Sequence, residues 1–294
     1  MYARPPRYVD GLPRPGRCLV MGVVNVTPDS FSDGGRWHEP ERAVAHGREL
    51  LAEGADLLDV GGESTRPGAT RPVVAEELDR VIPVITALAR EGAVVSVDTM
   101  RAEVADAALE SGAVLVNDVS GGLADPEILE VVARRGAAYA AMHWRAHADT
   151  MQKHAEYDDV VAEVTKELSL RVEAALAAGI DGSRLAVDPG LGFAKTARHN
   201  WSLLAGLDQL HELGLPILVG SSRKSFLGSA LADAEGEPRP VLDREDATTA
   251  LTTLAAAAGA WCVRVHNVRG NVDAVKVVAC WGDRMPRSGV GLDG

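Results

Sequence analysis

Short apolar runs alternate with longer segments of helical period along almost the whole chain. Each run is continuously apolar rather than alternating, which is typical of parallel strands buried on both faces. The eight runs are Leu19–Asn25, Leu57–Gly61, Val94–Asp98, Val114–Asn117, Ala138–His143, Leu185–Asp188, Ile217–Ser221 and Trp261–His266. Eight strand–helix units in about 265 residues predict an α/β fold, a (β/α)8 TIM barrel forming a single domain. The alternative is an open doubly wound sheet, but no Gly-x-Gly-x-x-Gly follows the first run.

The segments between the runs carry helix signals. Apolar positions recur at helical spacing through the second segment, at Leu78, Val81, Ile82, Ile85 and Leu88. Pro83 inside that segment predicts a kink or a break. Asp125 followed by Pro126 predicts an N-cap and the first helical residue of its own helix. Five glycines stand where helices should end: Gly54, Gly92, Gly112, Gly136 and Gly179.

The chain divides into one domain and two tails. We expect residues 1–17 to be a flexible N-terminal tail, residues 18–282 to form the barrel, and residues 283–294 to be a C-terminal tail. Three connections that follow strands are longer than a turn requires: Thr27–His38, Glu63–Pro72 and Trp144–Tyr157. Long loops at the C-terminal mouth of a barrel usually carry function. A further segment, Asp233–Asp243, is rich in Gly, Pro and charge and is expected to be a surface excursion.

Composition excludes several classes of partner. The net charge is −12 and the pI about 5.1, which argues against nucleic acid and against an anionic membrane surface. The three cysteines form no CxxC pair, so we expect reduced thiols and a cytoplasmic protein. No apolar signal-peptide core is visible near the N-terminus. The uncharged stretch Ala247–Val263 is short for a membrane span and is interrupted by Gly259, so we interpret it as a buried helix that leads into a strand.

Polar side chains stand at the ends of most of the runs. Asp98, Asn117 and Asp188 end three of them, and a closed barrel would bring them to one deep spot. Two carboxylates and a carboxamide suit a flat heterocycle with donor and acceptor edges. Each residue alone also has a structural explanation, as a helix cap or a turn former. We expect Asp59, inside its run, to be buried and hydrogen-bonded, and His143 to be structural or to lie at the rim of the site rather than to be catalytic.

Cationic and amide side chains follow the first and last runs. Arg264 and His266 share one face at i, i+2 beside a predicted helix N-terminus, an arrangement that suits phosphate. Asn25 offers a neutral oxygen to Mg²⁺, which takes its other ligands from water and phosphate. Lys224 and Arg66, on long loops, could hold a second, anionic substrate.

At these positions the chain resembles the dihydropteroate synthase family closely. Two long motifs carry the resemblance, Asn25–Gly35 and Asp59–Gly68, and shorter ones follow in family order: Ser96–Thr99, Asn117–Val119, Asp188–Phe193, Ser222–Lys224 and Arg264–His266. The resemblance extends from about Leu19 to Trp281. It leaves the two tails and the Trp144–Tyr157 loop without matching motifs.

The resemblance implies a pterin-binding (β/α)8 barrel, a homodimer and a target of sulfonamides. The implied reaction condenses 6-hydroxymethyl-7,8-dihydropterin diphosphate with 4-aminobenzoate, giving 7,8-dihydropteroate and diphosphate in folate biosynthesis. By resemblance, the pterin is held by Asp98, Asn117, Asp188 and Lys224. The diphosphate is held with Mg²⁺ by Asn25, Arg264 and His266, of which Asn25 is the metal ligand. The 4-aminobenzoate is held by Thr65, Arg66, Pro67, Phe193, Ser225 and Phe31. The residues with catalytic roles are Asp98, Lys224, Asp188 and Asp33, and Phe31 and Asp33 lie on a closing loop.

The chemistry of the bond to be broken favours an SN1-like displacement. Loss of diphosphate leaves a cation at the pterin methylene, which the negative field of Asp98 and Asp188 should stabilise. Two alternatives remain open. A pterin-dependent methyltransferase would share Asp98, Asn117 and Asp188 but would not need Arg264 and His266. A non-catalytic pterin-binding barrel should have lost some of the loop motifs.

Overall fold

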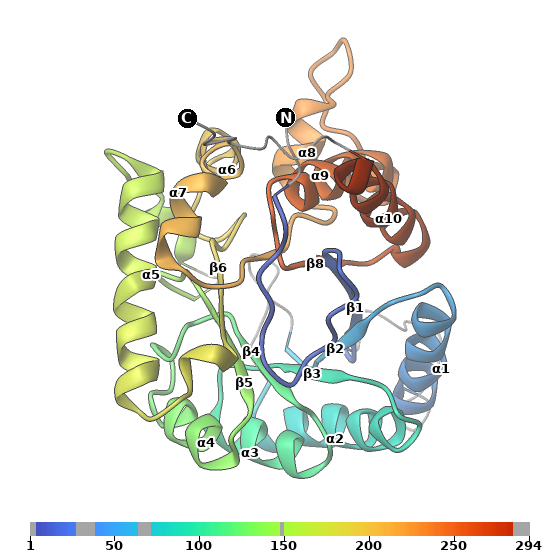
Figure 1. The fold of residues 1–294 in the computed structure, drawn as a ribbon, viewed down its shortest axis with the longest axis vertical. Helices are drawn as coiled ribbons and strands as arrows, with labels where there is room; N and C mark the ends of the chain where they lie inside the picture. Colours follow the sequence, from blue (N-terminus) through green and yellow to red (C-terminus); the bar gives the residue numbers. More distant parts are fainter. Residues whose placement is uncertain (1–3, 28–38, 64–71, 148–149, 285–294) are drawn as a thin grey trace, which may run out of the picture.

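The computed structural model describes residues 4–27, 39–63, 72–147 and 150–284. Within these ranges eight parallel strands form an inner ring that helices surround (Figure 1). The strands are β1 (Leu19–Asn25), β2 (Leu57–Gly61), β3 (Val95–Asp98), β4 (Leu115–Asp118), β5 (Ala138–Met142), β6 (Leu185–Asp188), β7 (Leu218–Val219) and β8 (Cys262–Val265). Their hydrogen-bonded order is β6-β5-β4-β3-β2-β1-β8-β7, and an isolated parallel bridge between Val187 and Ile217 links β6 to the β7 side. The predicted single-domain (β/α)8 barrel is confirmed.

The helices lie outside the strands as the apolar spacing predicted. Their bounds are α1 (Glu39–Ala52), α2 (Val74–Arg90), α3 (Ala102–Glu110), α4 (Glu127–Arg135), α5 (Val160–Ala177), α6 (Ala197–Ala205), α7 (Leu207–Leu210), α8 (Ser225–Ala230), α9 (Glu245–Ala257) and α10 (Val268–Arg284). None of the helices in the described ranges is long and apolar enough to cross a membrane. The uncharged stretch that could be mistaken for such a span forms α9 and leads into β8.

Two local predictions need correction. Helix α2 continues through Pro83 as one helix, so the predicted break is absent. Asp125 does not cap its own helix: its carboxylate accepts the N–H of Ala102 at 2.7 Å, at the start of α3, while Pro126 is the N-cap of α4. The Asp125 side chain therefore ties two neighbouring units together. The five predicted helix-ending glycines all have positive φ, as a left-handed C-terminal turn requires.

Apolar side chains fill the barrel in two layers. A large cluster packs between the strands and the helices, and a smaller one fills the inside of the ring around Met21, Leu57 and Leu115. The inner cluster occupies the half of the barrel that lies towards the N-terminal ends of the strands. The predicted site residues in the described ranges lie towards the opposite, C-terminal end of the strands.

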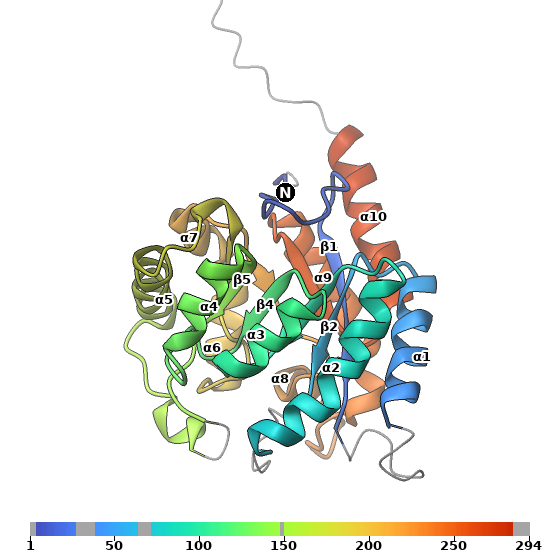
Figure 2. The ribbon, with the colours of Figure 1, turned by 90° about the horizontal axis from the view of Figure 1, so that it is seen from below.

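Residues 4–17 are not the flexible tail that the sequence predicted. Val9 is fully buried and Leu12 is 7 % exposed, and both belong to the cluster inside the barrel. The backbone N–H of Asp10 also donates to the carbonyl of Ser183 at 2.9 Å. Figure 2 shows this segment at the end of the barrel opposite α8. The segment therefore closes the base of the barrel. The predicted surface excursion at residues 233–243, by contrast, is exposed throughout and lies between α8 and α9.

Candidate active site

One row of residues crosses the strand ends at the mouth of the barrel. The sheet register places Asn25 beside Gly61, Gly61 beside Asp98, and Asp98 beside Asn117. Gly61 leaves the space that the Asp98 side chain uses, because a Cβ there would lie 3.3 Å from Cβ of Asp98. The structure thus brings three predicted site residues into one row.

Arg264 links this row to the buried carboxylate below it. Its Nε donates to Asp59 Oδ2 at 2.6 Å and its Nη2 donates to Asp98 Oδ2 at 2.7 Å. Asn117 Nδ2 donates to the same oxygen of Asp59 at 2.9 Å, and Asp59 is fully buried, as predicted. Burial raises the pKa of Asp98 to about 7; the Arg264 charge opposes this rise and the negative charge of Asp59 adds to it.

Asp188 and Lys224 form the second charged pair of the mouth. Asp188 Oδ1 accepts the N–H of Gly190 at 2.7 Å. Asp188 Oδ2 and Lys224 Nζ lie 3.7 and 4.0 Å from the position a Cβ would take at Gly220, so the missing side chain leaves them room. Burial raises the pKa of Asp188 while Lys224 opposes the rise. Burial also lowers the pKa of Lys224, to about 8, against the attraction of Asp188.

Phe193 stands next to this pair. Lys224 Nζ lies 4.8 Å from the centre of the Phe193 ring, and it also donates to the carbonyl of Leu191. Ser225, the first residue of α8, directly follows Lys224. An aromatic face beside a cation can receive a flat anionic ring. Phe193 and Ser225, which are predicted to hold 4-aminobenzoate, therefore lie beside Asp188 and Lys224, which are predicted to hold the pterin.

The predicted diphosphate residues come from two neighbouring strands: Asn25 ends β1, Arg264 lies in β8 and His266 directly follows β8. His266 Nδ1 lies 2.9 Å from Ser222 Oγ, which also accepts the backbone N–H of His266 at 3.3 Å. The Arg264 guanidinium is turned instead to Asp59 and Asp98. Asn25 is half-buried at the end of β1, which pairs with β8.

Five predicted site residues, Phe31, Asp33, Thr65, Arg66 and Pro67, lie outside the described residues. The described ends of the second loop are anchored: Arg80 donates to the carbonyl of Gly62 at 2.9 Å, and Arg101 donates to that of Pro72 at 2.5 Å. Arg80 therefore has a structural contact at the mouth.

Asn25 is the described residue that could hold Mg²⁺. In the ranges that the structure covers, no three His, Cys, Asp or Glu side chains form a metal-binding group. A single amide oxygen fits Mg²⁺ when water and substrate phosphate complete its coordination. The cysteines fit no catalytic role, since Cys18 and Cys262 are buried and Cys280 is exposed on α10.

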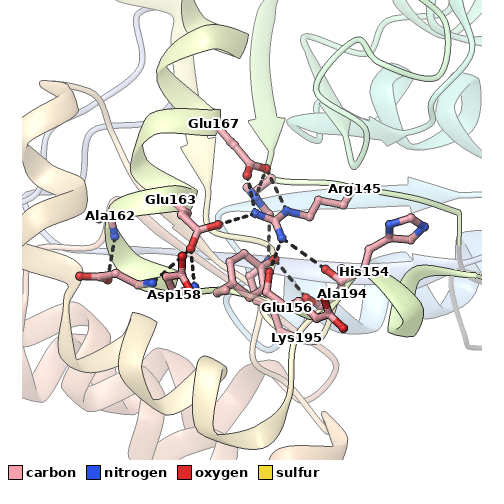
Figure 3. Close-up of polar contacts among 12 residues, drawn as sticks. Arg145, His154, Glu156, Asp158, Ala162, Glu163, Glu167, Ala194 and Lys195 are labelled. Atoms are coloured by element: carbon pink, nitrogen blue, oxygen red, sulfur yellow. Dashed lines mark hydrogen bonds and ion pairs between the residues drawn. The ribbon is translucent and has the colours of Figure 1, made fainter.

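Sequence reasoning missed a polar cluster behind Phe193, centred on Arg145 (Figure 3). Lys195, nearly fully buried, lies 2.9 Å from Nδ1 of His143, whose Nε2 lies 2.9 Å from Glu167. Burial lowers the pKa of His143 to about 4, although Glu167 opposes the change, so the ring is neutral near pH 7. The only signal along the chain was a lysine two residues after the aromatic that follows β6. His143 is buried between Lys195 and Glu167.

Comparison with known proteins decides the family. Residues 21–266 match the family described as pterin binding enzyme. The dihydropteroate synthase of Mycobacterium leprae is 56% identical over 263 residues, which are 89% of this chain and 93% of that protein. This chain belongs to the dihydropteroate synthase family.

Solved structures of dihydropteroate synthases agree. The Xanthomonas albilineans enzyme with 4-aminobenzoic acid has a TM-score of 0.84 at 47% identity, over 92% of this chain and 94% of that one. The Yersinia pestis enzyme in a sulfonamide drug complex has a TM-score of 0.85 at 41% identity, over 94% and 98% of the two chains. The resemblance of the motifs is confirmed, and neither the methyltransferase nor the non-catalytic alternative is favoured.

Proposed function

We propose that this dihydropteroate synthase joins 6-hydroxymethyl-7,8-dihydropterin diphosphate to 4-aminobenzoate and releases diphosphate, giving 7,8-dihydropteroate for folate biosynthesis. The observation that carries the proposal is the meeting of Asp98, Asn117, Asp188 and Lys224 at one mouth. The family match and the 4-aminobenzoic acid named for the X. albilineans structure support it.

The pterin ring is the substrate that the buried polar groups suit. Asp188 and Asn117 can accept and donate along one flat edge, and Lys224 can donate to a ring acceptor. Arg264 and Asp59 hold Asp98 and Asn117 in place from below. The ring would thus enter a site whose hydrogen-bonding groups are already oriented, which reduces the cost of ordering on binding.

The reaction breaks the C–O bond between the pterin methylene and the diphosphate. The bonding electrons leave with the diphosphate, and the methylene becomes a cation conjugated with the ring. The carboxylates of Asp98 and Asp188 stabilise this cation because both are buried, where charge interactions are strong. The arylamine nitrogen then forms the C–N bond and loses a proton. No protein nucleophile is required.

The leaving group would lie at the β1–β8 side of the mouth. Asn25, Arg264 and His266 are the residues we assign to the diphosphate. Asn25 would hold Mg²⁺ there, and the ion would supply charge neutralisation for the leaving group. His266 donates more strongly when protonated, and its ring is oriented by Ser222.

The acceptor, 4-aminobenzoate, would lie between Phe193, Lys224 and Ser225. We also assign to it the loop residues Thr65, Arg66, Pro67 and Phe31, and we assign Asp33 to the loop that closes over the site. Lys224 would then serve both substrates, since its Nζ lies 4.8 Å from the centre of the Phe193 ring and its charge interacts with that of Asp188. Sulfonamides would compete for this position.

We propose a homodimer built on α9 and α10, which pack against each other. Leu254 on α9 and Val277 and Trp281 on α10 are more than half exposed, which is unusual for large apolar side chains on neighbouring helices. A second copy of the chain would cover them, and sedimentation velocity of Val277→Asp against the parent chain tests this.

A cytoplasmic location stays a prediction from the reduced cysteines.

Product formation tests the function directly. The purified chain is incubated with both substrates, with and without Mg²⁺, and 7,8-dihydropteroate and diphosphate are quantified. We expect equal amounts of both products, dependent on Mg²⁺. Absence of pteroate from a folded, Mg²⁺-supplied chain would remove the proposal.

Titration of pyrophosphate with and without Mg²⁺ by calorimetry, compared between the parent and Asn25→Ala, tests the metal assignment without turnover.

A further inference from the structure

We propose that Lys195 and Tyr157 are positioning residues that fix the Phe193 ring and thereby set the affinity for the arylamine acceptor. The inference rests on the proposed function, because it assigns the Phe193 face to that acceptor. Neither residue is proposed to touch substrate. Both act through the backbone of the loop between β6 and α6.

Two adjacent carbonyls of this loop are held by side chains. Lys195 Nζ donates to the carbonyl of Phe193 at 3.0 Å, and Tyr157 Oη donates to the carbonyl of Ala194 at 3.0 Å. Ala194 has φ of +47°, a left-handed conformation that an alanine adopts only when its surroundings enforce it. The two successive peptide groups after Phe193 are therefore each fixed by a side chain, and the ring direction is fixed with them.

Lys195 is itself held from behind. Glu167 on α5 accepts from His143 Nε2–H, which leaves the lone pair of Nδ1 for Lys195 at 2.9 Å. Burial lowers the pKa of Lys195 to about 7, although Asp188 opposes the change. Charged or neutral, the amine keeps an N–H for the carbonyl of Phe193. A buried polar side chain of this kind persists only where its hydrogen bonds are made.

Tyr157 is held by Arg145 from the other end of the Trp144–Tyr157 connection. The guanidinium of Arg145 stacks 3.9 Å from the centre of the Tyr157 ring. Arg145 also binds Glu163 at 3.0 Å, Glu167 at 2.5 Å and the carbonyl of Glu156 at 2.7 Å (Figure 3). Arg145 thus holds the described part of the Trp144–Tyr157 connection together, and the Tyr157 hydroxyl at its end reaches the carbonyl of Ala194.

The acceptor side is the part of the mouth that this arrangement controls. Phe193 packs with Met100, Val119 and Met142, and its ring faces Lys224 Nζ at 4.8 Å. Asp98 belongs to β3, and its contact with Arg264 is independent of the β6–α6 loop. Asp188 and Lys224 adjoin this loop, whereas Asp98 and Asn117 are held by Arg264 and Asp59. Loosening the loop should therefore weaken the acceptor site much more than the pterin site.

Two conservative variants test the proposal. Tyr157→Phe removes one hydroxyl and keeps the ring under Arg145, and Lys195→Met removes the amine and keeps the chain length. For each we expect the KM for 4-aminobenzoate to rise about five- to tenfold, as for the loss of one buried hydrogen bond. Kd for the dihydropterin diphosphate, measured by calorimetry without acceptor, should change less than about twofold. Because both residues hold one peptide segment, the double variant should fall short of the product of the single effects.

The controls separate positioning from general stability. Tyr139→Phe removes another buried hydroxyl, which donates to Asp118 at 2.7 Å, and Lys166→Met removes an exposed lysine on α5. Both controls should leave the KM for 4-aminobenzoate unchanged. If the two variants lower the melting temperature but leave the KM for 4-aminobenzoate unchanged, Lys195 and Tyr157 have a purely structural role and the inference is overturned. An equal rise in the KM for 4-aminobenzoate and in the Kd for the dihydropterin diphosphate would overturn it as well. Product formation by the parent chain establishes the function independently of either result.

Discussion

The guanidinium of Arg264 lies 2.7 Å from the carboxylate of Asp98, although 166 positions separate the two residues. The same guanidinium binds Asp59, so one cation serves the fully buried Asp59 and the partly buried Asp98. These two carboxylates and the single guanidinium therefore leave an excess of negative charge at the inner end of the site. A cationic transition state above it would be stabilised, and a neutral substrate would gain less from the same field.

Asp98→Asn should remove most of this stabilisation. We expect kcat to fall by on the order of 100-fold or more, as for loss of one preorganised electrostatic contact, with the fold retained. Single-turnover kinetics and circular dichroism provide the measurement. Asp106→Asn, at a surface carboxylate that binds Arg135 at 2.6 Å, is the matched control and should keep parent kinetics. Parent-like turnover in Asp98→Asn would contradict the cation mechanism.

The pH profile should reflect the two substrate-binding groups whose pKa values lie near neutrality, because Lys195, whose burial lowers its pKa to about 7, keeps an N–H for the carbonyl of Phe193 in either form. Burial raises the pKa of Asp98 to about 7, so its charge is lost as pH falls through that value. Burial lowers the pKa of Lys224 to about 8, so its charge is lost as pH rises through that value. We therefore expect kcat/KM for the dihydropterin diphosphate to be bell-shaped, with its maximum between the two. In Lys224→Arg the alkaline limb should disappear, because arginine does not titrate there; an unchanged limb would assign it to another group.

Asp59→Asn should destabilise the protein. The substitution keeps the shape of the side chain but removes one of the two carboxylates that Arg264 binds, and Asp59 is fully buried. Breaking a buried ion pair from one side typically costs about 3–5 kcal/mol, and here Asp98 retains part of the interaction, so we expect about 3 kcal/mol. Urea unfolding measures the change, with Asp106→Asn expected to stay within about 1 kcal/mol of the parent. A stability change as small as that control's would argue against a structural role for Asp59.

Gly190→Ala should be much more damaging than Gly136→Ala. The two glycines have nearly equal φ, +66° and +63°. A Cβ at position 190 would overlap the carbonyl oxygen of His143, whereas at 136 its nearest neighbour is 4.0 Å away. We expect about 1–2 kcal/mol of destabilisation from left-handed strain alone at 136, and clearly more at 190. Paired urea unfolding curves decide, and equal losses would show that the close approach at Gly190 is relieved easily.

Deleting residues 1–17 should lower stability rather than leave the barrel unchanged. The deletion removes Val9 and Leu12 from the cluster inside the ring and uncovers apolar strand side chains such as Leu19 and Met21. Burial of each apolar side chain contributes roughly 1.5–3 kcal/mol. Calorimetry should therefore show a lower melting temperature, and Val9→Asp should reproduce part of the loss. A deletion variant with the parent melting temperature would support the loose tail instead.

The sequence alone determined the strand pattern and which residues end the strands. The bounds of β1, β2 and β6 agree with the apolar runs to the residue, because each run stops at a turn-forming or polar position. Where prediction and structure differ by a residue or more, as at the two-residue β7, pairing with neighbouring strands decides the ends. The placement of Asp98, Asn117 and Asp188 at one mouth followed from topology, since parallel strands of a closed barrel end on the same side.

Only the tertiary structure decided the partners of those residues. Arg264 and His266 are two positions apart at the end of β8, yet Arg264 turns to two carboxylates and His266 to Ser222. The contact of Lys195 with His143 spans 52 positions, and no local pattern announces it. The apolar side chains Val9 and Leu12 are buried because they pack into the N-terminal end of the barrel. Hydrophobic period reports on neighbours along one element, whereas a buried polar group takes whichever partner the packed chain brings within hydrogen-bonding distance.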